Sequence, residues 1–108
     1  MIYEYRVYTI FPGKMPKINE RFAKVTVPLF EKHGIKVVGF WQNAIGGYSN
    51  ELIYILGFED LAHREKAMQA FGQDPEWQKA RAASEVDGPL VEKITNTILR
   101  PTDYSPLR

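Results

Sequence analysis

Ile2-Tyr3-Glu4-Tyr5-Arg6-Val7-Tyr8-Thr9-Ile10 is the stretch on which the fold depends, and Phe11-Pro12-Gly13-Lys14 closes it. Aromatic and β-branched residues dominate this run, which is typical of a β-strand. Successive side chains of a strand point to opposite faces. A helix-covered face does not readily accept charges, so we expect Tyr3, Tyr5 and Val7 to face the core. The other face carries Glu4, Arg6 and Tyr8, and we expect it to meet a partner or line a cleft.

The rest of the chain predicts further elements in a recognisable order. Residues 15–33 have helical apolar spacing that Pro28 interrupts, and residues 44–49, with Gly46-Gly47, join predicted strands at 35–43 and 50–59. Asp60 and Asp74 are suited to cap two further helices, and residues 91–100 alternate as a last strand. The order β-α-β-β-α-β predicts a ferredoxin-like α+β fold, a four-stranded antiparallel sheet with both helical regions on one face.

Length and composition limit the classes of function. A chain of 108 residues predicts one domain, which we place at residues 1–101 with an extended tail at 102–108. The chain has no cysteine, which excludes thiolate metal sites and thiol nucleophiles. A net charge of +1, from 14 basic and 13 acidic residues spread along the chain, argues against nucleic-acid binding. No apolar run approaches the ~18 residues of a membrane span, and no signal-like segment precedes the first strand, so we expect a cytoplasmic protein.

The sheet face away from the helices predicts an assembly. Under the facing assigned above, that face carries the apolar residues Ile2, Tyr8, Ile10, Trp41, Tyr54, Leu56 and Phe58. Such a patch exceeds what monomers normally expose. We therefore expect a homodimer in which two sheets meet face to face about a two-fold axis and form a dimeric α/β barrel.

Several ordered strings resemble the NIPSNAP family. The strongest is Tyr3-Glu4-Tyr5-Arg6-Val7-Tyr8 with Pro12-Gly13-Lys14, and others are Lys32-His33-Gly34, Gly39-Phe40-Trp41, Gly47 with Asn50, Asp60 with Arg64, and Asp74-Pro75-Glu76-Trp77. The resemblance implies a ferredoxin-like homodimer with a cleft inside the joined sheets, and little about chemistry. The third strand departs from the pattern, because Tyr54 and Leu56 stand where family members tend to carry His and Trp.

Six polar or aromatic residues are the candidates for a ligand-binding cleft: Glu4, Arg6, Tyr8, Trp41, Asn43 and Tyr54. Glu4 and Arg6 lie two apart on one strand face and are either an ion pair that fixes dimer register or a ligand anchor. Tyr8 and Tyr54 either donate to a bound carbonyl or pack as aromatics. Trp41 and Asn43 share a strand face and are candidates to hold a polyketide-like or quinone-like ligand, by analogy with cofactor-free monooxygenases of this fold group.

Metal and cofactor sites have little support in the sequence. His33 lies at a predicted helix C-terminus and His63 in a first helical turn, and they do not have metal-ligand spacing. We expect no metal and no cofactor.

Three functions remain open for this chain. The first is binding of a small, partly apolar organic ligand, and the second is cofactor-independent oxygenation or isomerisation of an aromatic or polyketide-like substrate. The third is a purely structural module.

Overall fold

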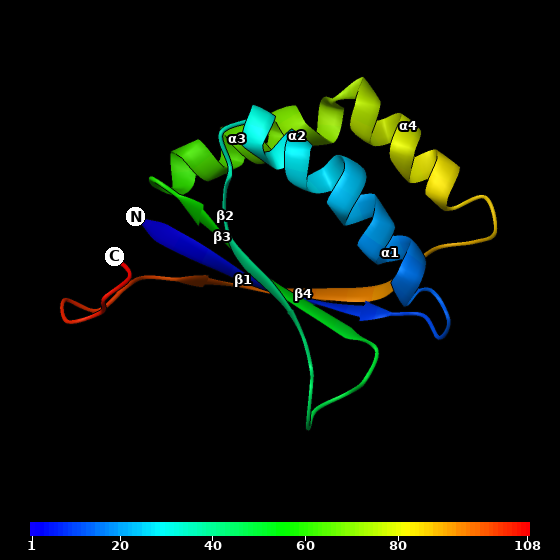
Figure 1. The fold of residues 1–108 in the computed structure, drawn as a ribbon. Helices are drawn as coiled ribbons and strands as arrows, with labels where there is room; N and C mark the ends of the chain where they lie inside the picture. Colours follow the sequence, from blue (N-terminus) through cyan, green and yellow to red (C-terminus); the bar gives the residue numbers. More distant parts are fainter.

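Four antiparallel strands form one sheet, and the helices cover one of its faces (Figure 1). The computed structural model describes residues 1–108. Its elements are β1 (Ile2–Ile10), α1 (Met15–Arg21), η1 (Phe22–Thr26), α2 (Val27–Lys32), β2 (Lys36–Gln42), β3 (Glu51–Phe58), α3 (Leu61–Gln73), α4 (Pro75–Ser84) and β4 (Val91–Leu99). The strand order is β2-β3-β1-β4, so each helical crossover passes one intervening strand: β3 lies between β1 and β2, and β1 lies between β3 and β4. The predicted ferredoxin-like α+β fold is confirmed, and the sheet of one chain is open.

The first helical region is divided near Pro28, as the sequence predicts. Between α1 and α2 the chain makes a five-residue π-helical turn, in which the Val27 N–H donates to the Phe22 carbonyl. A π turn reaches back five residues instead of four and so holds one extra residue. Pro28 lies in the first turn of α2, where its missing N–H costs little.

Two aspartates begin the second helical region, and both predicted N-caps are confirmed. The Asp60 carboxylate accepts the His63 N–H at 2.8 Å at the start of α3. The Asp74 carboxylate accepts the Glu76 N–H at 2.9 Å at the start of α4. Each cap satisfies a donor that the first helical turn cannot pair internally.

The predicted facing of β1 and β3 is wrong, because the apolar residues expected on the open face lie on the helix side instead: Ile2, Tyr8, Ile10, Tyr54, Leu56 and Phe58. Arg6 pairs with Tyr54, Glu4 with Leu56 and Tyr8 with Leu52, and this set faces the helices. The helix-side core comprises Ile10, Ile18, Phe22, Leu29, Phe30, Ile35, Leu52, Tyr54, Leu56, Phe58, Ala67, Phe71 and Leu90. Glu4 and Arg6 lie under the helices because Arg64 of α3 and Asn96 of β4 pair with the Glu4 carboxylate, which in turn pairs with Arg6.

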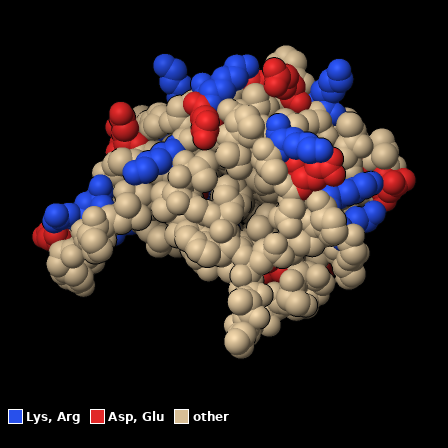
Figure 2. Space-filling model, viewed as in Figure 1, with Lys and Arg blue, Asp and Glu red and all other residues tan.

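The face away from the helices is therefore built from the other half of each strand. It presents Tyr3, Tyr5 and Val7 of β1, Ile53 and Ile55 of β3, Trp41 of β2 and Thr95, Thr97 and Leu99 of β4. Tyr5 remains 37 % exposed and Trp41 49 % exposed. Figure 2 shows charged side chains gathered over the helices, whereas the surface between the C-terminal tail and the β2–β3 loop carries almost none.

Candidate functional site

The Glu4 carboxylate is the centre of a buried polar network on the helix side of the sheet. Its side chain is 0 % exposed. Its Oε2 accepts hydrogen bonds from Arg6 Nη1 at 2.7 Å, Arg64 Nη2 at 3.1 Å and Asn96 Nδ2 at 3.0 Å. Its Oε1 accepts a fourth from Arg64 Nε at 2.8 Å. Three elements, β1, α3 and β4, are thus joined at one carboxylate.

The network continues from Arg6 to two tyrosines. Arg6 Nε donates to the Tyr54 hydroxyl at 2.8 Å, and Arg6 Nη2 donates to the Tyr8 hydroxyl at 3.4 Å. The Tyr54 and Tyr8 hydroxyls are 3.0 Å apart. Tyr54 is 1 % exposed and already accepts from Arg6, so its own hydrogen needs an acceptor, which the Tyr8 oxygen supplies. The hydrogen of Tyr8 then has no acceptor within the chain.

Ionisation in this network follows from its contacts. Burial alone would raise the pKa of Glu4, but hydrogen bonds from Arg64 and Asn96 and the charge of Arg6 outweigh it and lower that pKa to about 2. Burial opposes the charged form of Arg6, yet the nearby Tyr54, Tyr8 and Glu4 raise its pKa overall. Burial, followed by proximity to Tyr8, raises the pKa of Tyr54 well above its usual value. At neutral pH the network therefore holds an ionised carboxylate, two arginine cations and a neutral Tyr54.

Tyr8 links this network to a pocket. The pocket has a volume of about 420 Å³ and lies beside α4 and the start of β4. It is lined by Tyr8, Arg21, Trp77, Arg81, Glu85, Pro89, Val91, Glu92, Lys93 and Ile94. Its volume falls in the range of small-molecule sites, and it combines apolar walls with a few polar groups, as such sites do.

The pocket is open because the helices leave part of β4 uncovered. Ile94 points to the helix side, opposite Tyr8 in the neighbouring strand, yet it remains 46 % exposed. Ile98 is similarly exposed at 40 %. A ligand in the pocket would therefore meet apolar surface that no helix covers.

Two members of the network were not predicted from the sequence. Arg64 lies three and seven residues before Ala67 and Phe71, so it shares the inward stripe of α3 with two core residues. Asn96 alternates with Ile94 and Ile98 on β4 and lies opposite Arg6. A charged or amide side chain on an apolar stripe was the available signal in both cases.

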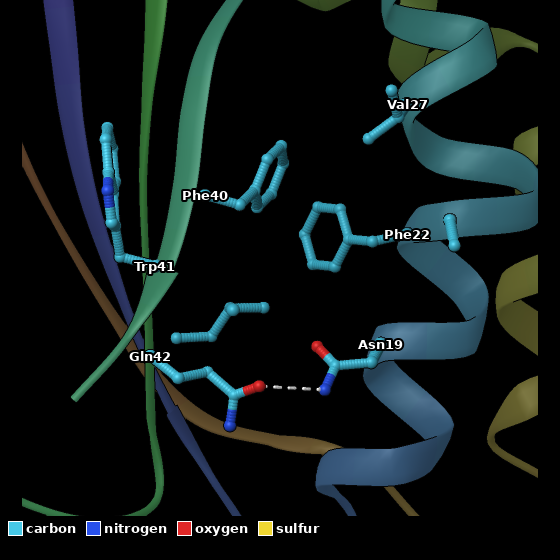
Figure 3. A pocket seen from close by; sticks show the side chains of 8 residues that line it. Asn19, Phe22, Val27, Phe40, Trp41 and Gln42 are labelled. Atoms are coloured by element: carbon cyan, nitrogen blue, oxygen red, sulfur yellow. Dashed lines mark hydrogen bonds between the residues drawn. The ribbon is translucent and has the colours of Figure 1, made fainter. Parts of the chain in front are cut away.

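Trp41 and Asn43 do not join the other four candidates. Figure 3 shows Phe40 pointing from β2 toward Phe22, while Trp41 points away on the other side of the strand. The Asn43 side chain donates to the Tyr48 carbonyl and the Glu51 carboxylate, both at 2.9 Å, and so stabilises the β2–β3 loop. The structure brings together Glu4, Arg6, Tyr8 and Tyr54 and leaves Trp41 and Asn43 outside that group.

A second, more apolar pocket of about 300 Å³ lies between the α1–η1 segment and β2 (Figure 3). Phe22, Phe40, Leu52 and Val27 supply its apolar walls. Across one end, Asn19 Nδ2 donates to Gln42 Oε1 at 3.2 Å. The network of Glu4 contributes no residue to this pocket.

Both histidines lie at helix ends. His33 is the C-cap of α2, and its Nε2 lies 2.7 Å from Asp74 Oδ2. Hydrogen bonds from His33, Lys32 and the Glu76 N–H lower the pKa of Asp74 to about 2. His63 Nδ1 accepts the Glu59 N–H at 3.0 Å.

No group of three His, Asp or Glu side chains is placed to hold a metal ion. None of the helices has the length and apolar composition of a membrane span.

Comparison with known proteins decides the family. The family model described as NIPSNAP matches residues 3–106. The chain belongs to the NIPSNAP family. Human Protein NipSnap homolog 3A is 34 % identical over 79 residues, which are 73 % of this chain and 31 % of that protein, so this NIPSNAP chain spans about a third of its relative.

Solved structures agree with the NIPSNAP assignment. A NIPSNAP family protein from Agrobacterium tumefaciens is 30 % identical, with a TM-score of 0.87 over 99 % of this chain and 98 % of that chain. A second from the same organism, described as having unknown function, is 28 % identical, with a TM-score of 0.86 over 100 % of this chain and 94 % of that chain. The NIPSNAP fold is thus shared over the full chain, while the activity of the family is not established by these relatives.

Proposed function

We propose that this NIPSNAP protein binds a small, partly apolar organic molecule in the pocket beside Tyr8, and that it acts as a homodimer. The observation that supports ligand binding is the Tyr8 hydroxyl. It accepts hydrogen bonds from Tyr54 and Arg6, and its own hydrogen has no acceptor in the chain. A donor fixed by a buried network at the wall of a pocket is suited to a carbonyl or carboxylate oxygen.

The network behind Tyr8 makes this donor well oriented. Tyr54 and Arg6 fix the position of the Tyr8 oxygen, and Glu4 holds the Arg6 guanidinium at 2.7 Å. A preorganised donor loses little freedom on binding, which favours affinity. Apolar contact would come from Trp77 and Ile94 in the same pocket.

The enzymatic alternative, a cofactor-independent monooxygenase or isomerase, has no comparable support. Trp41 and Asn43 were the residues expected to hold its quinone-like substrate, and both lie outside the network. We therefore propose binding without assigning a reaction.

The homodimer is proposed on the open face of the sheet. On this face, the middle parts of the two central strands, β1 and β3, carry only uncharged residues, among them Tyr5, Val7, Ile53 and Ile55. Tyr5 is 37 % exposed although it lies on a central strand. An apolar sheet face of this extent is covered in most soluble proteins, and a second copy would cover it symmetrically.

Binding is tested by thermal unfolding of the wild type and Tyr8→Phe with a panel of small aromatic and aliphatic carbonyl compounds. A ligand that binds only the folded state stabilises it by RT ln(1 + [L]/Kd), so at least one class of compound should raise the Tm of the wild type. Tyr8→Phe should reduce that increase, because it removes the donor and keeps the ring. A panel without any effect on the wild type would support a purely structural module instead.

Dimerisation is tested by sedimentation at micromolar concentration. The wild type should sediment as a dimer, and Tyr5→Lys, which places a charge in the middle of the open face, should shift it toward monomer. Lys79→Met on the exposed side of α4 is the control and should leave the dimer intact. A stable wild-type monomer at that concentration would refute the assembly.

A further inference from the structure

Arg21 is a buried arginine without a close counter-charge. Its side chain, at the end of α1, is 7 % exposed. Its Nη1 donates to the Ser84 hydroxyl at 3.1 Å, while the nearest carboxylate oxygen, Glu85 Oε2, is 4.0 Å away. Glu85 is engaged more closely by Arg81 Nε, at 3.1 Å. The Nε of Arg21 is buried and has no partner.

The contrast with Arg6 shows what Arg21 lacks. Arg6 is also largely buried, but it has the Glu4 carboxylate at 2.7 Å and two tyrosine acceptors. Buried charges in proteins are normally paired, because an isolated one loses its hydration without compensation. Burial accordingly lowers the pKa of Arg21 below its usual value, although an arginine stays protonated at neutral pH.

Arg21 lines the same pocket as Tyr8, and the surrounding charges favour an anion. Arg21, Arg81 and Lys93 are the basic residues of the lining, against two acidic residues, Glu85 and Glu92. The guanidinium of Arg21 lies over the Trp77 ring, 5.0 Å from its centroid. The pocket therefore places a partly unpaired cation and a free hydroxyl donor next to aromatic and aliphatic surface.

We infer that the ligand of this pocket is a small amphipathic organic acid, whose carboxylate is held by Arg21 and Tyr8 and whose apolar part lies against Trp77 and Ile94. The inference rests on the proposed function and specifies its ligand class. A carboxylate pairs well with a guanidinium, and in a partly buried site such charge-assisted hydrogen bonds are strong. The more apolar pocket beside β2 offers no cation and fits neutral molecules instead.

The test compares acids with amides of the same shape. The probes are benzoate and benzamide, cinnamate and cinnamamide, and hexanoate and hexanamide, measured by isothermal titration calorimetry. With the wild type, the acids should bind about 10-fold to 100-fold more tightly than their amides, because one charge-assisted contact at Arg21 separates the members of each pair. Arg21→Met should remove that preference, and Arg21→Lys should retain part of it.

The control is Lys79→Met, which removes one positive charge from the exposed side of α4 and should leave the preference unchanged. The acid–amide comparison on the wild type needs no variant and stands if Arg21→Met does not fold. Amides that bind as well as acids, with dependence on Tyr8, would overturn the organic-acid assignment and leave the proposed function intact. Binding of neither acids nor amides would overturn both, and tighter binding of inorganic phosphate than of any acid would overturn the amphipathic class.

Discussion

Glu4→Gln tests the buried network most directly. The substitution keeps the shape of the side chain and removes its charge, so Arg6 and Arg64 lose their shared counter-ion. A carboxyl whose pKa falls from 4.5 to about 2 on folding is stabilised in its ionised form by about 3 kcal/mol. Removal of one partner from a buried ion pair costs about 3–5 kcal/mol in other proteins. The two figures agree, and we expect a loss of about 3 kcal/mol in the free energy of unfolding.

The assay is urea unfolding at pH 7 and at one fixed protein concentration, because a dimer would make stability depend on concentration. Glu20→Gln is the matched control. Glu20 forms an exposed pair with Lys24 at 3.1 Å, and such pairs contribute about 0–1 kcal/mol. A loss below about 1 kcal/mol for Glu4→Gln would show that the network does not stabilise the fold.

The same carboxylate makes a prediction about pH. The pKa of Glu4 is lower in the folded protein than in the unfolded chain, so its contribution is present in full above about pH 4.5 and is lost as the pH falls toward 2. The stability difference between the wild type and Glu4→Gln should therefore narrow over that interval. A difference that stays constant from pH 5 to pH 2.5 would contradict the assigned ionisation.

Three further substitutions address other parts of the fold. Phe71→Ala should lower the free energy of unfolding, measured in urea, by about 3–5 kcal/mol. Phe71 is buried, and the centroid of its ring lies 4.8 Å from that of Phe30. Asp74→Ala should lower the urea midpoint at pH 7, with a smaller effect near pH 2, because the ionised carboxylate caps α4 and contacts His33. Gly47→Ala should lower stability by about 1 kcal/mol in the same assay, since Gly47 has a φ of +66° that side chains rarely adopt.

The sequence contained enough information for the element order because its signals are local. Asp60 and Asp74 precede helices, Pro28 marks a break in a helical stripe, and Gly46-Gly47 forms a loop with positive φ. Each of these depends on a residue and its near neighbours. The resulting β-α-β-β-α-β order has few allowed topologies, so the fold followed.

The facing of the sheet depended on contacts that no local pattern contains. Glu4 is tolerated under the helices because Arg64 and Asn96, 60 and 92 residues further along the chain, bind it. The residue pattern of β3 does not distinguish its two faces, because Tyr54 and its neighbour Ile55 are both apolar enough for either face. Trp41 was correctly placed on the open face, whereas Glu4, Arg6, Tyr8 and Tyr54 were not.

The π turn at Phe22–Thr26 determines how α2 is rotated about the helix axis relative to α1. A regular α-helix advances by about 100° per residue, so without the π turn the extra residue would rotate α2 by about that angle relative to α1. Leu29 and Phe30 would then leave the sheet. A single-residue deletion within Phe22–Thr26 should therefore give a regular helix that keeps Leu29 and Phe30 on the sheet, whereas an insertion into this segment should turn them away from it.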